Sequence, residues 1–476
     1  MTTFQFIRFA FVGFFISSLL NSGHALPVFS EQTAEKCAAC HINIGELTPK
    51  GRKFKLLAYA EGEKVSIPFS AIATGSLTKI RDTSSSLDST ITMPKNGAFI
   101  PEGASALITG KFADGIGGKV KWTADMANTS PIYGTQGVQT GAKVGKDLLL
   151  DASEVRVAKQ SSVWDKGLIY GASINNAPGQ EDLWVTTPVN SFPYKSSQLV
   201  NAWGLGQFGP TTLIDGGLTS QTIGLNLFGL LDDRWYFALG NYWKMSSNKS
   251  IIAVAGPTET INASKNPYLR IAYTEADERR TWMTGLFGMQ TTLARDPLVM
   301  GSASGVYKDI GVDAEFQNIT DTHTWSGQAV LIREIVDWGP RSVGRSHDAA
   351  TTHLTTLKTK VSYSYARKYT GSVFGFKSKG TQDNLYWAYN NDPTVVTGAC
   401  NQNQSLLAFC SQNGKPDTSG FGYELMYNPV PQVTVAFQQT YYTKFLGGST
   451  FIDNSSGNLR SAKDNNLTYI YLLYAY

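Results

Sequence analysis

Beyond residue 25 the chain has no run of about twenty apolar residues, which is the length that a membrane-spanning helix needs. The sequence therefore excludes transmembrane helices in that region. Charged residues are also scarce, at 16% of 476, which is few for the surface of a soluble protein. The formal net charge is only +4, so nothing in the charge balance indicates binding to nucleic acid.

Cysteine is scarce too, with four residues, and two of them belong to the string CAACH at residues 37–41. Cys400 and Cys410 are distant and lack the spacing of zinc ligands, which disfavours a zinc site. No alternation of strands and helices follows, which disfavours a thioredoxin-like redox pair. The spacing instead predicts one covalently bound haem c, with Cys37 and Cys40 adding to the porphyrin vinyl groups and His41 as the proximal iron ligand.

The first 25 residues are typical of a secretory signal peptide. Arg8 precedes an apolar run at residues 9–20, and small residues at Gly23 and Ala25 suit a signal peptidase. Export would place the chain where haem is attached covalently and where disulfides persist. For an exported chain we predict that Cys400 and Cys410 close a loop disulfide.

Residues 26–60 form the predicted haem segment, and they are too few for an independent cytochrome domain of several helices. The segment must therefore be supported by the rest of the chain. The cations of the basic stretch at residues 47–56 have two interpretations. They neutralise haem propionates or face an acidic redox partner, or else they form an ordinary solvated helix face. The sequence does not settle the distal iron ligand: Met93 is the nearest downstream candidate and Met126 the next, with plain packing as the alternative. Three histidines lie in polar stretches: His323, His347 and His353. We predict that they are exposed loop residues. The alternative is that one of them binds the haem or an external metal.

Residues 61–476 show short stretches that alternate between apolar and small or polar residues. Examples are residues 223–240, 361–366 and 422–438. This period of two favours an antiparallel outer-membrane β-barrel with lipid outside and a polar lumen, where Glu424 would be tolerated. The last stretch, residues 467–476, ends on Tyr476 and resembles the closing strand of such barrels. A secreted β-sandwich or solenoid is the alternative.

We predict about sixteen strands, because bacterial barrels have even numbers and the chain offers roughly fourteen to eighteen candidates. A lumen of that size is wide enough to hold the haem segment as a short helical plug. The long polar stretches at residues 340–353 and 447–463 are expected on the outside, since periplasmic turns are short.

Several stretches resemble the fused outer-membrane monohaem cytochrome-porin family: residues 29–33, 37–41, 46–56, 150–156, 173–178, 186–188, 192–194 and 213–218. The resemblance covers most of the first half of the chain and, through the closing strand, the whole architecture. It implies a single c-type haem that plugs a barrel of about sixteen strands and passes electrons to periplasmic carriers. The best-known relatives oxidise ferrous iron, but this sequence is closer to members of unassigned substrate.

The sequence thus predicts an outer-membrane c-type cytochrome, with its haem segment on the periplasmic side or in the lumen. It would carry electrons between an extracellular donor, with ferrous iron as one candidate, and a periplasmic cytochrome or copper protein. No catalytic acid or base is needed for such a transfer. The alternatives are a passive porin-like channel with a haem-bearing structural plug, and a secreted soluble β-protein with a haem arm. The direction of electron flow is left open.

Overall fold

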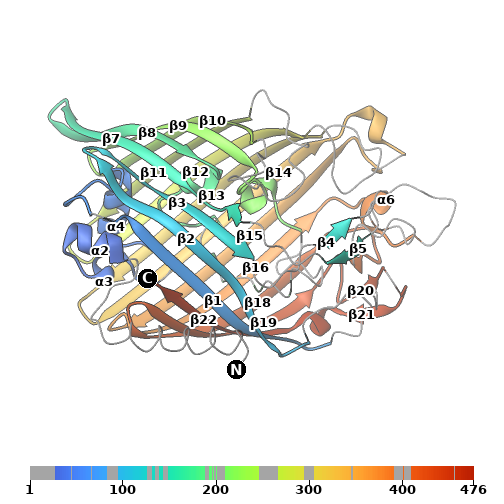
Figure 1. Ribbon diagram of the computed structural model, residues 1–476. Coiled ribbons are helices and arrows are strands. Elements are labelled where there is room, and N and C mark those ends of the chain that lie inside the picture. Colours follow the sequence, from blue (N-terminus) through green and yellow to red (C-terminus); the bar gives the residue numbers. More distant parts are fainter. Residues whose placement is uncertain are drawn as a thin grey trace.

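The computed structural model consists mainly of one closed antiparallel sheet, with short N-terminal helices at one end (Figure 1). The predicted signal peptide lies outside the described residues, as do Met93 and Met126. The structure describes residues 27–43, 45–65, 67–82, 95–125, 131–133, 139–142, 148–187, 192–193, 195, 197, 200, 210–245, 266–293, 305–344, 347–390, 400, 409–454 and 456–476.

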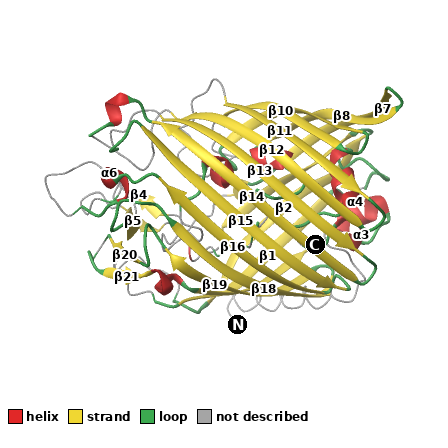
Figure 2. Cartoon of the chain, turned by 180° about the vertical axis from the view of Figure 1, so that it is seen from behind, coloured by secondary structure: helices red, strands yellow, loops and turns green. Residues whose placement is uncertain are grey.

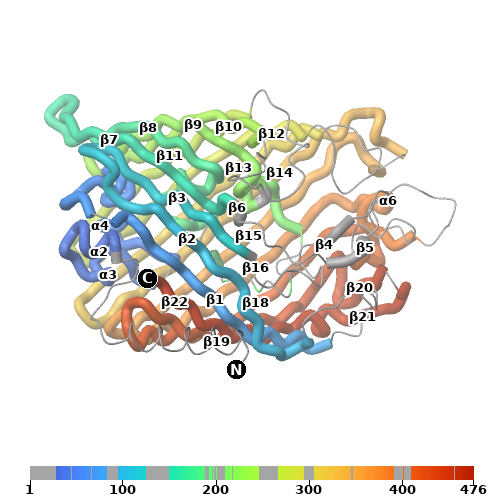
Figure 3. The backbone as a smooth tube through the Cα atoms, in the orientation of Figure 1, coloured from blue at the N-terminus to red at the C-terminus, as the bar shows by residue number. Residues whose placement is uncertain are grey.

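Sixteen strands, each hydrogen-bonded to the next along the chain, form the barrel, which confirms the predicted number. The short β6 (Leu148–Leu150) extends β7 beside β3. β22 pairs with both β19 and β1, which closes the barrel (Figure 3). The strands are β1 (Phe69–Ile80), β2 (Phe99–Ala113), β3 (Ile116–Asp125), β7 (Glu154–Val163), β8 (Lys166–Asn175), β9 (Thr222–Leu231), β10 (Trp235–Lys244), β11 (Asn266–Ala276), β12 (Arg280–Leu293), β13 (Gly305–Ile319), β14 (His323–Asp337), β15 (Thr351–Tyr365), β16 (Tyr369–Gly380), β18 (Thr418–Val430), β19 (Val433–Lys444) and β22 (Leu467–Ala475).

The two faces of the barrel differ as the period of two predicts. In β9, Leu225 and Leu227 are 49% and 63% exposed on the outer face, whereas Asn226 between them is fully buried on the inner face. In β18, Glu424 is buried on the inner face and Leu425 is exposed on the outer one, as expected. A closed barrel with an apolar outer face satisfies every strand hydrogen bond within lipid, so the chain is a protein of the bacterial outer membrane.

Tight turns join the strands at one end of the barrel, and long connections join them at the other. The β7–β8 turn has positive φ at Trp164 (52°) and Asp165 (60°), and the β15–β16 turn has positive φ at Ala366 (50°) and Arg367 (52°). Two successive left-handed residues are the conformation of a type I′ hairpin turn, whose twist matches that of the strands. Because short turns are periplasmic in such barrels, the tight-turn end faces the periplasm.

Three short helices lie at this periplasmic end (Figures 1 and 2): α2 (Pro27–Thr33), α3 (Cys37–Cys40) and α4 (Pro49–Leu56). We call residues 27–65 the plug. α4 begins where it does because the Thr48 side chain caps its first turn by accepting from the Gly51 amide and Pro49 occupies the first helical position. Among the described helices, none is long and apolar enough to span a membrane.

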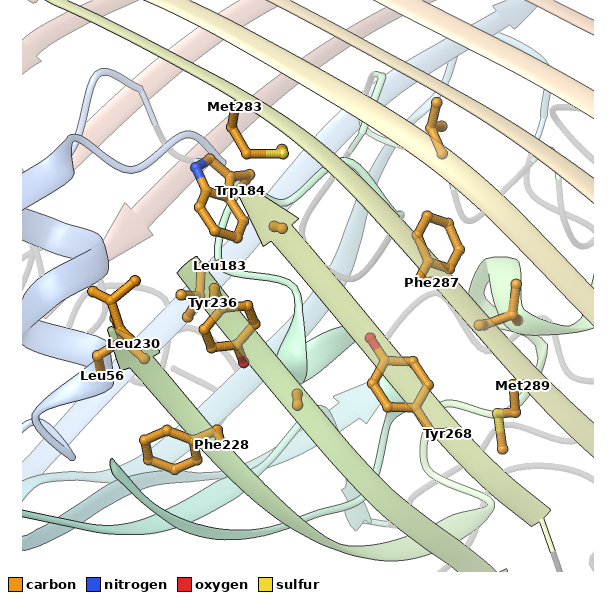
Figure 4. Packing of buried hydrophobic residues seen from close by; sticks show 14 of the residues in the cluster. Leu56, Leu183, Trp184, Phe228, Leu230, Tyr236, Tyr268, Met283, Phe287 and Met289 are labelled. Atoms are coloured by element: carbon orange, nitrogen blue, oxygen red, sulfur yellow. The ribbon is translucent and has the colours of Figure 1, made fainter. Parts of the chain in front are cut away.

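The connection between β8 and β9 turns inward and carries two short helical turns, η1 (Pro178–Glu181) and η2 (Leu213–Gly217). We call its described residues between 176 and 221 the inward loop. A cluster of buried side chains joins this loop to the plug and to the inner face of the barrel. Figure 4 shows Leu56 of the plug near Leu230 and Tyr236 of the wall, with Leu183 and Trp184 of the inward loop beside them.

The opposite end carries the long connections, with β20 and β21 among them (Figure 2). The described residues of the polar stretches at 340–353 and 447–463 belong to these connections and the adjoining strand ends, as predicted. Cys400 and Cys410 form a disulfide whose Cα atoms are 5.6 Å apart. A second cluster of buried apolar residues packs beneath this end. The described elements of these connections are β4 (Pro131–Tyr133), β5 (Gln139–Ala142), η4 (Pro340–Ser342), α6 (Asn384–Trp387), β17 (Phe409–Cys410), β20 (Thr450–Asp453), β21 (Leu459–Ser461) and η5 (Ala462–Asn465).

Candidate functional site

The helix α3 brings the predicted haem residues together. Cys37 and Cys40 are its first and last residues, so their side chains lie on the same face, one helical turn apart. Both side chains are partly exposed. His41 follows at once in an extended conformation, and its amide donates to the Cys37 carbonyl at 2.9 Å.

The imidazole of His41 is partly buried, and its Nδ1 atom is buried without a hydrogen-bond partner among the described residues. Burial, and then the nearby cation of Lys119, lower the pKa of His41 from 6.5 to about 4. The ring is therefore neutral at neutral pH, which is the form that binds a metal ion. Two thiols on one helical turn beside a neutral imidazole fit a covalently attached haem.

The connection from α3 to α4 is closed by several short hydrogen bonds. The Thr48 amide donates to the Cys40 carbonyl at 2.9 Å, and the Thr48 hydroxyl donates to the Ala39 carbonyl at 2.6 Å. Gly51 makes this approach possible, because a Cβ atom there would lie 2.2 Å from the Cys40 carbonyl oxygen. The cysteine-bearing turn is therefore held directly against α4.

Three aromatic rings hold the helices of the plug together. Phe29 of α2 lies 5.3 Å from Phe54 of α4 and 5.4 Å from Tyr59, measured between ring centroids. Phe54 and Tyr59 are 5.6 Å apart. A core of three rings is small, in keeping with a segment that the sequence predicts cannot stand alone.

The plug is tied to the barrel wall by buried ion pairs. Arg52 and Glu315 of β13 are 2.7 Å apart, and their side chains are 6% and 1% exposed. The Lys55 ammonium lies 3.1 Å from Glu154 of β7. These contacts place α4 inside the periplasmic mouth of the barrel, against two separate strands.

A third ion pair comes from the turn between α3 and α4. Glu46 lies 3.0 Å from Lys360 of β15, and it also accepts hydrogen bonds from Ser326 and Ser362. Although burial alone would raise the pKa of the Glu46 carboxyl, the Lys360 cation and the hydrogen bond from Ser326 lower it below its ordinary value. Glu46 is therefore ionised at neutral pH and anchors the segment that carries the cysteines.

The inward loop lies directly against the plug. Arg156 of β7 pairs with Glu154 at 2.7 Å and with Glu181 of the inward loop at 3.0 Å. Glu154 is also the partner of Lys55 in the plug. One buried cation, Arg156, therefore connects the inward loop with the plug. The Arg52 guanidinium lies 5.8 Å from the centroid of the Trp184 ring. The inward loop and the plug thus share ion-pair partners on β7.

Further ion pairs and hydrogen bonds fasten the inward loop to other strands of the wall. Asp182 pairs with Arg270 of β11 at 3.2 Å and accepts from the backbone amides of Trp184, Thr186 and Thr187. At the other end of the loop, Asp215 pairs with Lys358. The lumen therefore holds two anchored layers near its periplasmic end, first the plug and then the inward loop.

The basic stretch that includes α4 is divided by the fold. Lys50 and Lys53 are exposed and pair with Glu35 and Asp233, as a solvated face would. Arg52 and Lys55, in contrast, are buried against the wall. The solvated-face interpretation is wrong for these two, and their partners could not be found from sequence because they lie 263 and 99 positions away.

The other described histidines belong to the barrel strands and their connections. His347, predicted to be exposed, is only 2% exposed, which corrects that expectation. Its ring lies between Trp338 and Tyr386, at 4.0 and 5.0 Å, and its Nδ1 atom is 2.7 Å from Asp383.

His323 and His353 are strand residues instead of loop residues. His323 begins β14 at the periplasmic end and is exposed there, with its Nδ1 atom 2.7 Å from the Tyr363 hydroxyl. His353 is the third residue of β15 and is partly exposed, at the end with the long connections. Neither lies in the plug.

No family model matches the chain, and no curated protein matches it. Solved structures do align with it. A loop-L8 deletion mutant of the outer membrane protein OmpT of Vibrio cholerae aligns at 8% identity over 86% of this chain and 98% of that chain, with a TM-score of 0.42.

The outer membrane channel DcaP of Acinetobacter baumannii aligns at 11% identity over 86% of this chain and 96% of that chain, with a TM-score of 0.39. Salmonella typhi OmpF in complex with daunomycin aligns at 11% identity over 86% and 97%, with a TM-score of 0.39. These TM-scores are too low to assign the fold by similarity. The assignment of an outer-membrane barrel therefore comes from the strand pairing of the chain itself. The chain is an outer-membrane β-barrel whose periplasmic mouth carries a Cys-x-x-Cys-His turn.

Proposed function

We propose that this protein is a single-haem c-type cytochrome of the outer membrane, which carries electrons between an extracellular donor and periplasmic carriers. The observation that carries the proposal is the pair of partly exposed thiols on one turn of α3, followed at once by the neutral imidazole of His41. A haem bound there supplies one-electron redox chemistry. The partner on the periplasmic side would be a cytochrome or copper protein, since the turn lies at that end.

In this proposal the chain's own residues bind and position the cofactor. Cys37 and Cys40 supply the two sulfur atoms for thioether bonds, and His41 supplies the proximal nitrogen. The anchors of Arg52 and Glu46 hold the cysteine-bearing turn at the mouth, because both are buried in ion pairs with the wall. The distal ligand, for which Met93 is the candidate, stays a prediction.

The position of the motif limits the class of donor. Strands of 15 residues, such as β13, β14 and β15, rise about 3.3 Å per residue and tilt by about 45°, so the barrel wall is about 35 Å tall. A particle or protein held at the far end would be separated from α3 by most of that height. We therefore expect a donor that is a solute small enough to enter the lumen, a class that includes ferrous iron.

A passive channel is the second candidate function. The observation that favours it is the closed barrel with a polar inner face, which is the architecture of diffusion pores. In that case the plug would be a structural stopper that carries haem without passing electrons. The plug and the inward loop would then set the size of the solutes that cross.

The test begins with covalent haem, detected by its peroxidase activity on a denaturing gel of purified outer membranes. We expect staining of the wild type, loss of staining in Cys37→Ala and Cys40→Ala, and full staining in the matched control Cys400→Ala/Cys410→Ala. An optical titration with ferrous iron and other small donors then follows. Absence of covalent haem in the wild type would overturn the proposal.

Conductance in planar bilayers separates the two candidate functions. An electron carrier should show a haem that a small donor reduces and a periplasmic acceptor reoxidises. A passive channel should show a haem that donors and acceptors do not affect, together with solute conductance that is equal in the wild type and in Cys37→Ala. The second result would reject electron transfer and leave the channel.

A further inference from the structure

An apolar groove of about 450 Å³ runs along the outer face of the barrel, near the tight turns of β15–β16 and β18–β19. This volume is within the range of about 300–1,000 Å³ that is usual for small-molecule sites. The groove is open toward the membrane and lies on the opposite side of the wall from the plug. The residues that line it are Tyr363, Tyr365, Tyr369, Thr370, Gly371, Leu425, Met426, Tyr427, Val435, Ala436, Phe437 and Ile470.

The groove exists because one outward position lacks a side chain. Gly371 faces outward in β16, between Tyr369 and Val373, which are 50% and 60% exposed. A Cβ atom at Gly371 would touch only Leu425, at 3.6 Å, which is ordinary van der Waals contact. Crowding therefore does not require glycine at position 371. A larger side chain there would fit, and it would fill the groove.

Tyrosine rings form the periplasmic part of the groove. Tyr369 and Tyr427 stack with their centroids 5.1 Å apart and their planes at 15°. Tyr365, at the end of β15, is 46% exposed beside them. Rings at this height are typical of the boundary between hydrocarbon and headgroups, where the apolar part of the ring meets acyl chains and the hydroxyl meets water.

Two cations lie at the periplasmic end of the groove, in the β15–β16 turn. Lys368 is exposed, and its ammonium lies 5.7 Å from the centroid of the Tyr427 ring. Arg367 is half-buried, and the Asp321 carboxylate in the neighbouring turn attracts its positive charge. Cations at the end of an apolar groove in this layer of the membrane match the shape and charge of an anionic lipid.

We infer that this groove binds one anionic phospholipid of the periplasmic leaflet, with an acyl chain along Gly371 and the phosphate against Arg367 and Lys368. The apolar lining excludes a polar ligand from the groove itself, and the two cations favour a lipid phosphate over an uncharged surface. A second copy of the chain would have to bring a matching acidic patch to the same turn. This site does not depend on the proposed haem or on electron transfer.

The experiment is native mass spectrometry of the protein purified in mild detergent, with phosphatidylglycerol then titrated into the solution. We expect the wild type to retain one phospholipid. Gly371→Leu, which fills the groove, should lower lipid retention at least tenfold, and Arg367→Ser/Lys368→Ser should lower it for phosphatidylglycerol. The matched control is Gly229→Leu, because Gly229 faces outward near the periplasmic end of β9 and its Cβ would also meet its nearest neighbour at 3.6 Å.

The outcomes separate the sources of the signal. Loss in Gly371→Leu with retention in Gly229→Leu supports the site, provided that both variants keep the heat-dependent gel shift of a folded barrel. Equal retention in both variants would overturn it, as would a wild type that binds inorganic phosphate but no lipid. A lipid-free dimer in the wild type that Gly371→Leu dissociates would reject the lipid and assign the groove to a second copy.

Discussion

The ion pair between Arg52 and Glu315 should hold the plug in the periplasmic mouth. Arg52→Met removes the cation but keeps a side chain of similar length, and it leaves the Glu315 carboxylate buried at 1% exposure without its charged partner. Breaking a buried pair in this way costs about 3–5 kcal/mol. Lys53 is the matched control, because its 3.5 Å pair with Asp233 is exposed and such pairs contribute about 0–1 kcal/mol.

Hydrogen exchange of the Leu57 amide measures the docking of the plug, because this amide donates to the Lys53 carbonyl at 2.9 Å in the last turn of α4. If exchange requires undocking, a loss of about 3–5 kcal/mol speeds it by roughly two to four orders of magnitude. Lys53→Met should speed it by less than about tenfold. Arg52→Met/Glu315→Met should restore most of the protection, since an apolar pair can replace a buried ion pair.

Equal exchange rates in Arg52→Met and Lys53→Met would refute the idea that the buried pair anchors the plug. So would a double variant that exchanges as fast as Arg52→Met, because the loss would then come from the Arg52 side chain and not from the unpaired Glu315. Unfolding of the whole barrel is detected separately, by loss of the heat-dependent gel shift. The comparison therefore concerns the plug alone.

Two further predictions concern the same segment. Gly51→Ala should destabilise the plug by about 1–3 kcal/mol, because the new Cβ would lie 2.2 Å from the Cys40 carbonyl oxygen. Limited proteolysis of the plug measures this loss. Gly167→Ala is the control, because a Cβ there would lie in open space. The lowered pKa of Glu46 means that its stabilising effect is present above its ordinary pKa of 4.5 and is lost as the pH falls through the lower folded value. Hydrogen exchange of the plug, measured as the pH is lowered, should therefore show a contribution from Glu46 that is absent in Glu46→Gln. If the two pH profiles are the same, the role assigned to the pair with Lys360 is wrong.

Much of the barrel could be predicted from the sequence because its signal is local. In β9 the outward Leu225 and the inward Asn226 are neighbours in the chain, so burial on two faces appears directly as a period of two. The approximate number of strands follows from counting such stretches. The Cys-x-x-Cys-His motif is local too, since Cys37, Cys40 and His41 occupy a single helical turn and its cap.

The anchoring of the plug could not be predicted, because its partners are distant in sequence. Nothing around Arg52 or Lys55 distinguishes them from the exposed Lys50 and Lys53; only the closed barrel brings Glu315 and Glu154 to them. The burial of His347 has a similar cause, because one of the two rings that cover it comes from 39 positions further along the chain.

The sequence by itself therefore determined the features that depend on adjacent residues: the Cys-x-x-Cys-His turn, and strands with an apolar and a polar face. Only the tertiary structure decided which end of the barrel holds that turn, which cations are buried, and that the inward loop lies against the plug. The physical reason is that a period of two assigns a side chain to a face, whereas an ion pair inside a lumen needs the whole sheet to close before its partners meet.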